Sequence, residues 1–272
     1  MTWSWRQGKG LTYLTIPCWE AEGIQIGFST RWGGVSLSPY ASLNLGLHVG
    51  DAPDKVQINR DLWFKEWDVH PSQVAVGEQV HGTRIHQVKE EDGGRGSESL
   101  DSAIVGVDGL YTMCHTGLMA FFADCVPVFF YHPRLQSVGI AHAGWKGTSR
   151  KIVGQILEEF QRLGGEPDET WAAIGPSIGP CCYEVDERVI DEFAKNFTQM
   201  PFIRPGRSGH ALLDIKAANE MVLREAGIPR ERLWIARECT ACHTDSFFSH
   251  RLEGPHTGRM AGWIRRLPKR EE

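Results

Sequence analysis

Four β-rich segments follow one another closely in the middle of the chain, and they constrain its fold more than any other feature. They cover residues 103–112, 118–122, 126–131 and 137–141. Their β-branched and aromatic residues are typical of strands. Further short strands are expected at residues 11–16, 23–29, 74–80, 84–88, 171–174, 233–236 and 247–249. The polar segment 90–101, which contains three glycines, is expected to be a surface loop.

Helices are expected apart from these strands. After Gly147, apolar residues recur at helical spacing from Ile152 to Leu163, and Thr148 is the expected N-cap. Amphipathic helices are also expected at residues 55–67, 186–197 and 214–226, the last capped by Asp214. Consecutive strands with separate helices favour an α+β fold over a doubly wound sheet. We expect a single domain over residues 1–272.

Composition narrows the class of protein. With 41% hydrophobic and 23% charged residues, the 272-residue chain resembles ordinary globular proteins with a full core. A net charge of −5 gives no general attraction to nucleic acids or anionic membranes, so neither is an expected partner. The N-terminal segment has no apolar run typical of a signal peptide, and no run is long enough to span a membrane. Together with seven cysteines, an odd number, this indicates reduced thiols in the cytoplasm.

The strongest chemical pattern lies in residues 123–148. Cys125 precedes an apolar strand pair and His142 lies in its last strand, so we expect the two at opposite ends of the pair. His81, in Gln79-Val-His-Gly-Thr83, adds a second imidazole. One thiolate and two imidazoles suit zinc and leave a fourth position open, which is typical of a catalytic metal. Taken singly, His81 could be a surface group, Cys125 an inert thiol and His142 a turn cap.

Several familiar chemistries have no motif here. The sequence lacks a phosphate loop, a dinucleotide fingerprint, a His-Glu-x-x-His helix and a Gly-x-Ser-x-Gly elbow. Cys239-Thr-Ala-Cys242-His243 matches the haem c attachment pattern, but five residues are a weak signal and attachment follows export. We therefore expect Cys239 and Cys242 to be two buried structural thiols, with a redox pair as the alternative.

Seven segments carry a resemblance to a known family. They are Phe28-Ser-Thr-Arg-Trp-Gly-Gly-Val-Ser36, Ser42-Leu-Asn-Leu-Gly46, Gln79-Val-His-Gly-Thr83, Ala123-Asp-Cys-Val-Pro127, Ala141-His-Ala-Gly-Trp-Lys-Gly-Thr148, Ile174-Gly-Pro-Ser-Ile-Gly-Pro-Cys-Cys-Tyr-Glu184 and Asp245-Ser-Phe-Phe-Ser-His-Arg251. In this order, over residues 25–262, they resemble the laccase-domain family. That family was labelled multicopper polyphenol oxidase and later reassigned as purine nucleoside phosphorylase and adenosine deaminase.

The resemblance implies a specific fold, cofactor and activity. The fold would be α+β, with mixed sheets layered between helices as α/β/β/α, and zinc would be held by His81, Cys125 and His142. The activity would be phosphorolysis of adenosine, inosine, guanosine and also methylthioadenosine to base plus ribose 1-phosphate, with deamination of adenosine to inosine. The partners would be small-molecule purine nucleosides and phosphate, and a homodimer is kept open.

Each of the two reactions asks for particular residues. A phosphate nucleophile needs cationic donors, for which Arg31, Arg60 and Lys146 are the candidates, with ordinary surface charge as the alternative. Neutral hydrogen bonds to sugar or base could come from side chains in the same motifs. These are Asn44, Gln79 and Thr83.

Deamination needs a water activated by the metal and a group that transfers its proton. Asp124, beside Cys125, is the candidate for that proton transfer. It could equally orient His81 or His142 by accepting a hydrogen bond from the ring nitrogen that does not bind the metal. The catalytic set is therefore expected to comprise Asp124, Cys125 and His142.

Two other classes of function stay open. A copper polyphenol oxidase is one, because two His and one Cys also describe a blue-copper site. However, the paired His-x-His motifs of laccases are absent. The other is a cysteine hydrolase acting on an amide such as a peptidoglycan precursor, with Cys125 as nucleophile and His142 as base.

Overall fold

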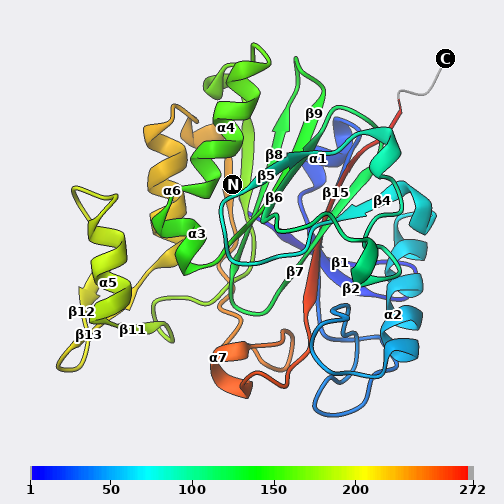
Figure 1. The fold of residues 1–272 in the computed structure, drawn as a ribbon, viewed down its shortest axis with the longest axis horizontal. Coiled ribbons are helices and arrows are strands. Elements are labelled where there is room, and N and C mark those ends of the chain that lie inside the picture. Colours follow the sequence, from blue (N-terminus) through cyan, green and yellow to red (C-terminus); the bar gives the residue numbers. More distant parts are fainter. Residues whose placement is uncertain (1, 269–272) are drawn as a thin grey trace.

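Two large mixed β-sheets lie face to face between helices in a computed structural model of the protein, which describes residues 2–268 (Figure 1). The first sheet has the order β1 (Ser4–Gln7), β2 (Thr12–Thr15), β3 (Ile24–Ser29), β15 (Met260–Arg266), β7 (Gly117–Phe122) and β4 (Val74–Val76). The second has the order β14 (Leu233–Ile235), β10 (Trp171–Ile174), β8 (Val126–His132), β9 (Ser137–Ala143), β6 (Gly109–Thr112) and β5 (Ile85–Gln87). The two sheets are mixed because β4–β7, β5–β6 and β10–β14 pair in parallel among antiparallel neighbours.

The helices and a third, small sheet complete the fold. The small sheet pairs β11 (Glu184–Asp186), β13 (His210–Leu213) and β12 (Ile203–Pro205). The helices are α1 (Pro17–Ala21), α2 (Pro53–Glu66), α3 (Trp145–Ser149), α4 (Ile152–Arg162), α5 (Glu187–Ala194), α6 (Ile215–Glu225) and α7 (His250–Glu253). In Figure 1, α5 and the small sheet lie together beyond the edge of the layered body.

The main core lies between the two large sheets. Phe28 and Phe122 of the first sheet share one buried cluster with Phe129 and Ile140 of the second. Burying each such side chain contributes roughly 1.5–3 kcal/mol. Gly262 of β15 lets the sheets approach closely, because a Cβ there would lie 3.0 Å from Ile140 and Phe129.

Helices cover the outer face of each large sheet. Trp63 and Trp67 at the end of α2 pack with Trp263 of the first sheet. Ile156 and Phe160 of α4 share a cluster with side chains of the second sheet and with α6. The predicted α+β class and its α/β/β/α layering are therefore confirmed.

The strand pair β8–β9 corrects one expectation about the metal set. The two strands pair antiparallel, with Val126 opposite Ala143 and Pro127 opposite His142. Cys125, immediately before β8, is therefore at the same end of the pair as His142, and the prediction of opposite ends was wrong. Because β9 runs back antiparallel to β8, its last residues lie beside the first residues of β8. Cys125 and His142, 17 positions apart in sequence, are therefore neighbours in space.

Local predictions had mixed outcomes. Asp214 caps α6 as expected, by accepting a hydrogen bond from the backbone N–H of Ala217. Thr148 does not begin a helix. It lies inside α3, and α4 begins only after Lys151. The positive φ of Lys151, 57°, is left-handed and separates the two helices. Residues 247–249 form no strand but lead into α7, where Ser249 is the N-cap.

The predicted single domain over residues 1–272 stays a prediction, and residues 1 and 269–272 lie outside the described part of the chain. Across residues 2–268, none of the helices is both long enough and apolar enough to span a bilayer.

Candidate metal centre and its cavities

Three metal-binding side chains predicted from the sequence converge in the structure. The ligand atoms of His81, Cys125 and His142 all lie within 4.8 Å of one another. The two imidazoles meet edge to face, with ring centroids 4.8 Å apart. His81 comes from the loop after β4, Cys125 from the residue immediately before β8 and His142 from β9. The convergence therefore depends on both large sheets being in place.

A buried carboxylate that the sequence analysis did not select holds two of these residues. Asp108 accepts a hydrogen bond from His142 Nδ1 at 2.8 Å. It also accepts from three successive backbone N–H groups, at Val80, His81 and Gly82. Because the carboxylate is an acceptor, Nδ1 of His142 carries the proton and Nε2 is free to bind a metal.

The backbone around the site adopts uncommon conformations. His81 and Asp124 have positive φ values of 58° and 82°, in the left-handed region that non-glycine residues rarely occupy. Such residues cost of order 1–3 kcal/mol each and persist where surrounding contacts enforce them. For His81, that enforcement is the set of N–H bonds to Asp108.

A glycine also shapes the site. A Cβ at Gly144 would lie 3.0 Å from Cys125 Sγ and 3.1 Å from His81 Cδ2. Only glycine therefore leaves both ligands undisturbed at the start of α3.

The side chains of Cys125 and His142 shift each other's pKa. Burial by itself would raise the pKa of Cys125, but the charge and hydrogen bonds of His142 and His81 lower it to about 6. Burial would lower the pKa of His142, but the Cys125 thiolate and Asp108 raise it to about 9. At neutral pH the set therefore holds a thiolate beside the His142 imidazolium. A metal ion binding there would displace the Nε2 proton of His142, and the thiolate and two neutral imidazoles would then fit zinc as three ligands of four.

The centre opens onto a cavity of about 480 Å³, within the usual range for small-molecule sites. His81 and Cys125 line it, whereas His142 lies behind them. Trp145 and Tyr183 supply aromatic walls, and Arg251 lies over the Tyr183 ring at 4.9 Å. Further polar groups that line it are Glu184, Asp186, Arg207 and His210.

A second cavity, of about 330 Å³, adjoins the first through two shared residues. His81 and Trp145 line both cavities. The second also presents three cations, Lys146, Arg150 and Arg188, with Glu192 as a carboxylate. Lys146 Nζ lies 5.6 Å from the centre of the Trp145 ring. We call this second cavity the cationic pocket.

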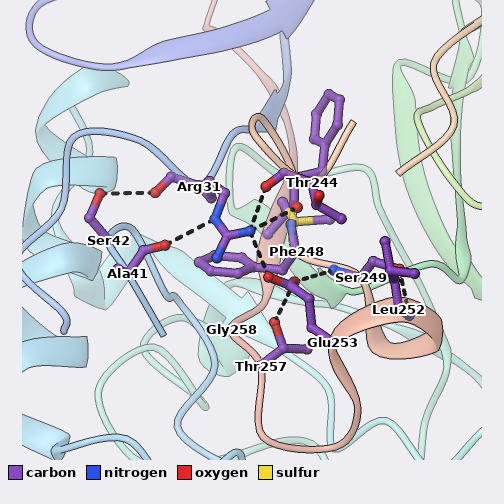
Figure 2. A network of polar contacts seen from close by, with 12 residues as sticks. Arg31, Ala41, Ser42, Thr244, Phe248, Ser249, Leu252, Glu253, Thr257 and Gly258 are labelled. Atoms are coloured by element: carbon purple, nitrogen blue, oxygen red, sulfur yellow. Dashed lines mark hydrogen bonds and ion pairs between the residues drawn. The ribbon is translucent and has the colours of Figure 1, made fainter. Parts of the chain in front are cut away.

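Arg31 does not reach either cavity. Figure 2 shows its guanidinium among carbonyl and carboxylate oxygens, where it donates to Ala41 O, Thr244 O and Glu253 Oε1 and lies over the Phe248 ring. The Glu253 ion pair is 2.8 Å long. Arg31 thus ties the 31–42 segment to the region of α7.

Other polar candidates serve the fold in the same way. Arg60 is fully buried, donates to three backbone carbonyls of Leu45, Gly96 and Ser97, and its burial lowers its pKa to about 9. Asn44 is buried, and its side chain forms hydrogen bonds with Asp51 and with the backbone of Arg259.

Two further candidates also lie away from the two cavities. The Gln79 side-chain amide donates one hydrogen bond to the backbone carbonyl of Phe121 and accepts one from its backbone N–H. Thr83 is half-buried and lines neither cavity.

Asp124 lines the larger cavity, but its oxygens are engaged elsewhere. They accept hydrogen bonds from Thr240 Oγ1 at 2.6 Å, Ser249 Oγ at 3.0 Å and Arg251 N at 2.6 Å. The carboxylate that orients His142 is Asp108, so the idea that Asp124 does so was wrong. Asp124 instead joins the β14 loop to the start of α7.

The residues that sequence reasoning missed had little local signal. Asp108 lies inside the β-rich stretch of residues 103–112, directly before β6, where a single aspartate does not stand out. Tyr183, Glu184 and Arg251 stand within segments that carry the family resemblance, although none was selected.

Fold and site define a class: a layered α+β protein with a thiolate–imidazole centre at the junction of two cavities. The model of one protein family, described as "Multi-copper polyphenol oxidoreductase laccase", matches residues 25–267. The chain belongs to this family.

Named relatives are similar over most of their length. "Purine nucleoside phosphorylase YlmD" of Geobacillus stearothermophilus is 43% identical over 250 residues, 90% of each chain. The protein of the same name from Bacillus subtilis is 36% identical over 88% of this chain and 87% of its own. The crystal structure of the Geobacillus stearothermophilus YlmD superposes with a TM-score of 0.93 over 97% of this chain and 99% of that one, at 38% identity. A Neisseria meningitidis protein, NMB0706, has a TM-score of 0.79 at 29% identity, over 90% of this chain and 95% of its own.

Proposed function

We propose that this protein cleaves purine nucleosides by phosphorolysis, at a zinc centre held by His81, Cys125 and His142. The substrates would be adenosine, inosine, guanosine and methylthioadenosine, and the same centre would deaminate adenosine. The observation that carries the proposal is the pair of cavities that meet at His81 and Trp145. One is large and partly aromatic, the other small and cationic. The names of the relatives, purine nucleoside phosphorylases, point in the same direction.

The nucleoside fits the larger cavity by its chemistry. A purine is flat and aromatic, and Trp145 and Tyr183 offer faces for it. Arg251 holds the Tyr183 ring from one side and donates to the Glu184 carbonyl at 2.7 Å, which fixes that wall. Carboxylates such as Glu184 can accept hydrogen bonds from ribose hydroxyls or an exocyclic amine.

Phosphate fits the cationic pocket. Lys146, Arg150 and Arg188 supply positive charge, and guanidinium groups match phosphate oxygens. Of these, Arg150 is already 3.5 Å from Glu192, so Lys146 and Arg188 are the cations whose charge is less offset. A nucleophile held there would approach the sugar across the shared wall of His81 and Trp145.

The protein groups around the centre have distinct roles in this proposal. A zinc ion bound there supplies Lewis acidity and lowers the pKa of bound water towards about 7. Asp108 fixes the tautomer of His142 and the turn that presents His81. Positive charge develops on the ribose and negative charge on the departing base during phosphorolysis. Cationic and N–H donors near the base therefore favour its departure.

Proton transfer in deamination is the less defined part. Asp124 lies beside Cys125 in the cavity wall, but three donors occupy its oxygens. Glu184 and Asp186 are further carboxylates that line the cavity. Glu184 already accepts from Arg207, and Asp186 Oδ1 accepts from Val189 N as the N-cap of α5, so we assign the proton transfer to Oδ2 of Asp186.

One specific observation favours a second candidate function. The low pKa of Cys125 and the high pKa of His142 describe a thiolate–imidazolium pair, the arrangement that activates a cysteine nucleophile. A cysteine hydrolase acting on an amide, such as a peptidoglycan precursor, would use that pair without metal. The same three ligands also fit a blue-copper site, but a laccase-type oxidase would in addition need a histidine-rich copper cluster. Within residues 2–268, the clusters of three or more candidate metal ligands are this set and one of four cysteines, not a histidine-rich cluster.

The test is phosphate dependence in matched variants. Inosine cleavage is measured with phosphate varied, in the wild type, in Lys146→Ala and in Lys65→Ala, an exposed cation at the end of α2. We expect Lys146→Ala to raise the KM for phosphate about 30-fold or more, which is about 2 kcal/mol of lost electrostatic stabilisation. Lys65→Ala should leave it unchanged. A rate independent of phosphate in the wild type would refute phosphorolysis. Amide hydrolysis by metal-free protein would establish the second candidate instead.

A further inference from the structure

Four cysteine sulfurs outside the proposed active centre converge near the surface. Cys181 and Cys182 lie in the turn after β10, and Cys239 and Cys242 in the loop after β14. Their Sγ atoms all lie within 4.8 Å of one another. The expectation of two buried structural thiols was therefore only half right, because Cys239 is buried but Cys242 is exposed and both have sulfur neighbours from another segment.

The parallel pairing of β10 and β14 explains why the two loops meet. Ala172, Ala173 and Ile174 pair with residues 233–235. The pairing continues beyond the strands through a bridge between Ser177 and Cys239 and a hydrogen bond from Thr240 N to Ser177 O. Both chains then turn in the same region, and the four thiols lie side by side.

The sulfur geometry fits a tetrahedral metal better than a disulfide. Cys242 Sγ is 3.4 Å from both Cys181 Sγ and Cys182 Sγ. A disulfide needs about 2.05 Å, and one sulfur cannot bond two others. Four thiolates around one zinc, each at about 2.3 Å, would lie about 3.8 Å from one another in a tetrahedron. The two 3.4 Å separations are slightly shorter than that value, and no separation among the four sulfurs exceeds 4.8 Å.

The surroundings of the cluster also suit bound thiolates. Gly179 N donates to Cys239 Sγ at 3.1 Å. A Cβ at Gly179 would lie 3.3 Å from Cys181 Sγ, so glycine permits this close approach. The buried Lys216 ammonium donates to the carbonyls of Ala236 and Glu238, which fixes the chain just before Cys239. It also supplies positive charge near a site that four thiolates would make negative.

We propose that Cys181, Cys182, Cys239 and Cys242 hold a structural zinc ion, distinct from the proposed active centre. Four protein ligands leave no open position, so this ion stabilises structure and takes no part in chemistry. The ion would hold together the two loops that form part of the wall of the larger cavity. Tyr183 and Glu184 follow Cys182 directly and line that cavity, and Thr240, between Cys239 and Cys242, donates to Asp124.

The test is zinc content and coordination of the full-length protein, purified under reducing conditions. The variants are Cys181→Ser/Cys182→Ser, Cys125→Ser and a control, Cys18→Ser/Cys114→Ser, whose thiols lie outside both groups. We expect the first to lose about one zinc per chain relative to the wild type, and the control to lose none. Cys125→Ser removes only the active-centre ligand. X-ray absorption at the zinc edge of that variant should show four sulfur neighbours at about 2.3 Å.

Several outcomes would overturn this proposal, and they are independent of the proposed function. Unchanged zinc in Cys181→Ser/Cys182→Ser would do so, as would the absence of zinc from folded Cys125→Ser. Iron in place of zinc, or a disulfide among the four cysteines in non-reducing peptide mapping, would also contradict it. If the double serine variant fails to fold, the coordination measured in Cys125→Ser still decides the matter.

Discussion

Replacing Asp108 by Asn tests how the protein positions the metal centre. The substitution keeps the size of the side chain but removes its charge and half of its acceptor capacity. The wild-type carboxylate accepts four hydrogen bonds, from His142 Nδ1 and from the N–H groups of Val80, His81 and Gly82. The Asn amide would turn an NH₂ group towards some of these donors. We therefore expect about two of the four bonds to be lost.

The magnitude follows from those bonds. Each hydrogen bond to a charged group contributes about 1.5–3 kcal/mol, so two lost bonds correspond to about 3–6 kcal/mol before relaxation. After relaxation we expect the free energy of unfolding to fall by about 3 kcal/mol. Loss of the partner of a ligating histidine should also weaken zinc binding about 10- to 100-fold.

The assays are denaturant unfolding and zinc competition with a chelator, with the exposed Asp101→Asn as control. The pH dependence adds a separate check. Burial would raise the pKa of Asp108, but the hydrogen bond and charge of His142, with the N–H groups of Gly82 and Val80, hold it below its ordinary value. Its contribution is therefore complete above the unfolded-state pKa of about 3.9 and is lost as the pH falls through the lower folded-state pKa. Wild-type zinc affinity and stability in Asp108→Asn at pH 7 would refute this account.

Four further predictions follow from named contacts. Cys125→Ser should lose the active-centre zinc and nucleoside cleavage while keeping its fold, as shown by metal analysis, activity and circular dichroism; full zinc with lost activity would favour a cysteine nucleophile. Gly144→Ala should lower the zinc affinity of the active centre, because the added methyl group would press against Cys125 and His81. Chelator competition measures this affinity, and an unchanged value would contradict the geometry. Arg31→Ala should lower the thermal midpoint but leave the KM for phosphate unchanged, because its bonds go to Thr244, Glu253 and other protein groups. Thr240→Val should cost about 1 kcal/mol of unfolding free energy by removing one donor to Asp124, and no change in denaturant midpoint would count against that bond.

Much of the fold could be predicted because its signals are local. The strands around residues 118–141 are continuous apolar runs, and the helices near residues 152–162 and 215–225 have clear apolar stripes. Strand β15 was missed because Gly262, Arg265 and Arg266 dilute its apolar pattern. Its pairing partners, β3 and β7, lie more than a hundred residues earlier. A local stretch of sequence therefore cannot show that β15 pairs with β3 and β7.

The site shows the same division. Cys125 and the two histidines are a recognisable set by residue type, and the structure brings their ligand atoms together. Polar residues such as Arg31 and Arg60 were selected by type for phosphate binding, yet their N–H groups bond backbone carbonyls inside the fold. Thr148 was expected to cap a helix, but its hydroxyl bonds the Ala143 carbonyl and accepts from Asn219. Which polar group meets substrate and which meets backbone depends on tertiary contacts.

The most direct test of the central claim is a product balance. Wild-type protein and Cys125→Ser are incubated with inosine and phosphate, and released hypoxanthine and ribose 1-phosphate are quantified together. We predict that the wild type forms the two in equal amounts, with a rate that rises and saturates with phosphate, and that Cys125→Ser forms neither. Hypoxanthine released with free ribose, or equal activity in Cys125→Ser, would contradict phosphorolysis at the His81–Cys125–His142 centre.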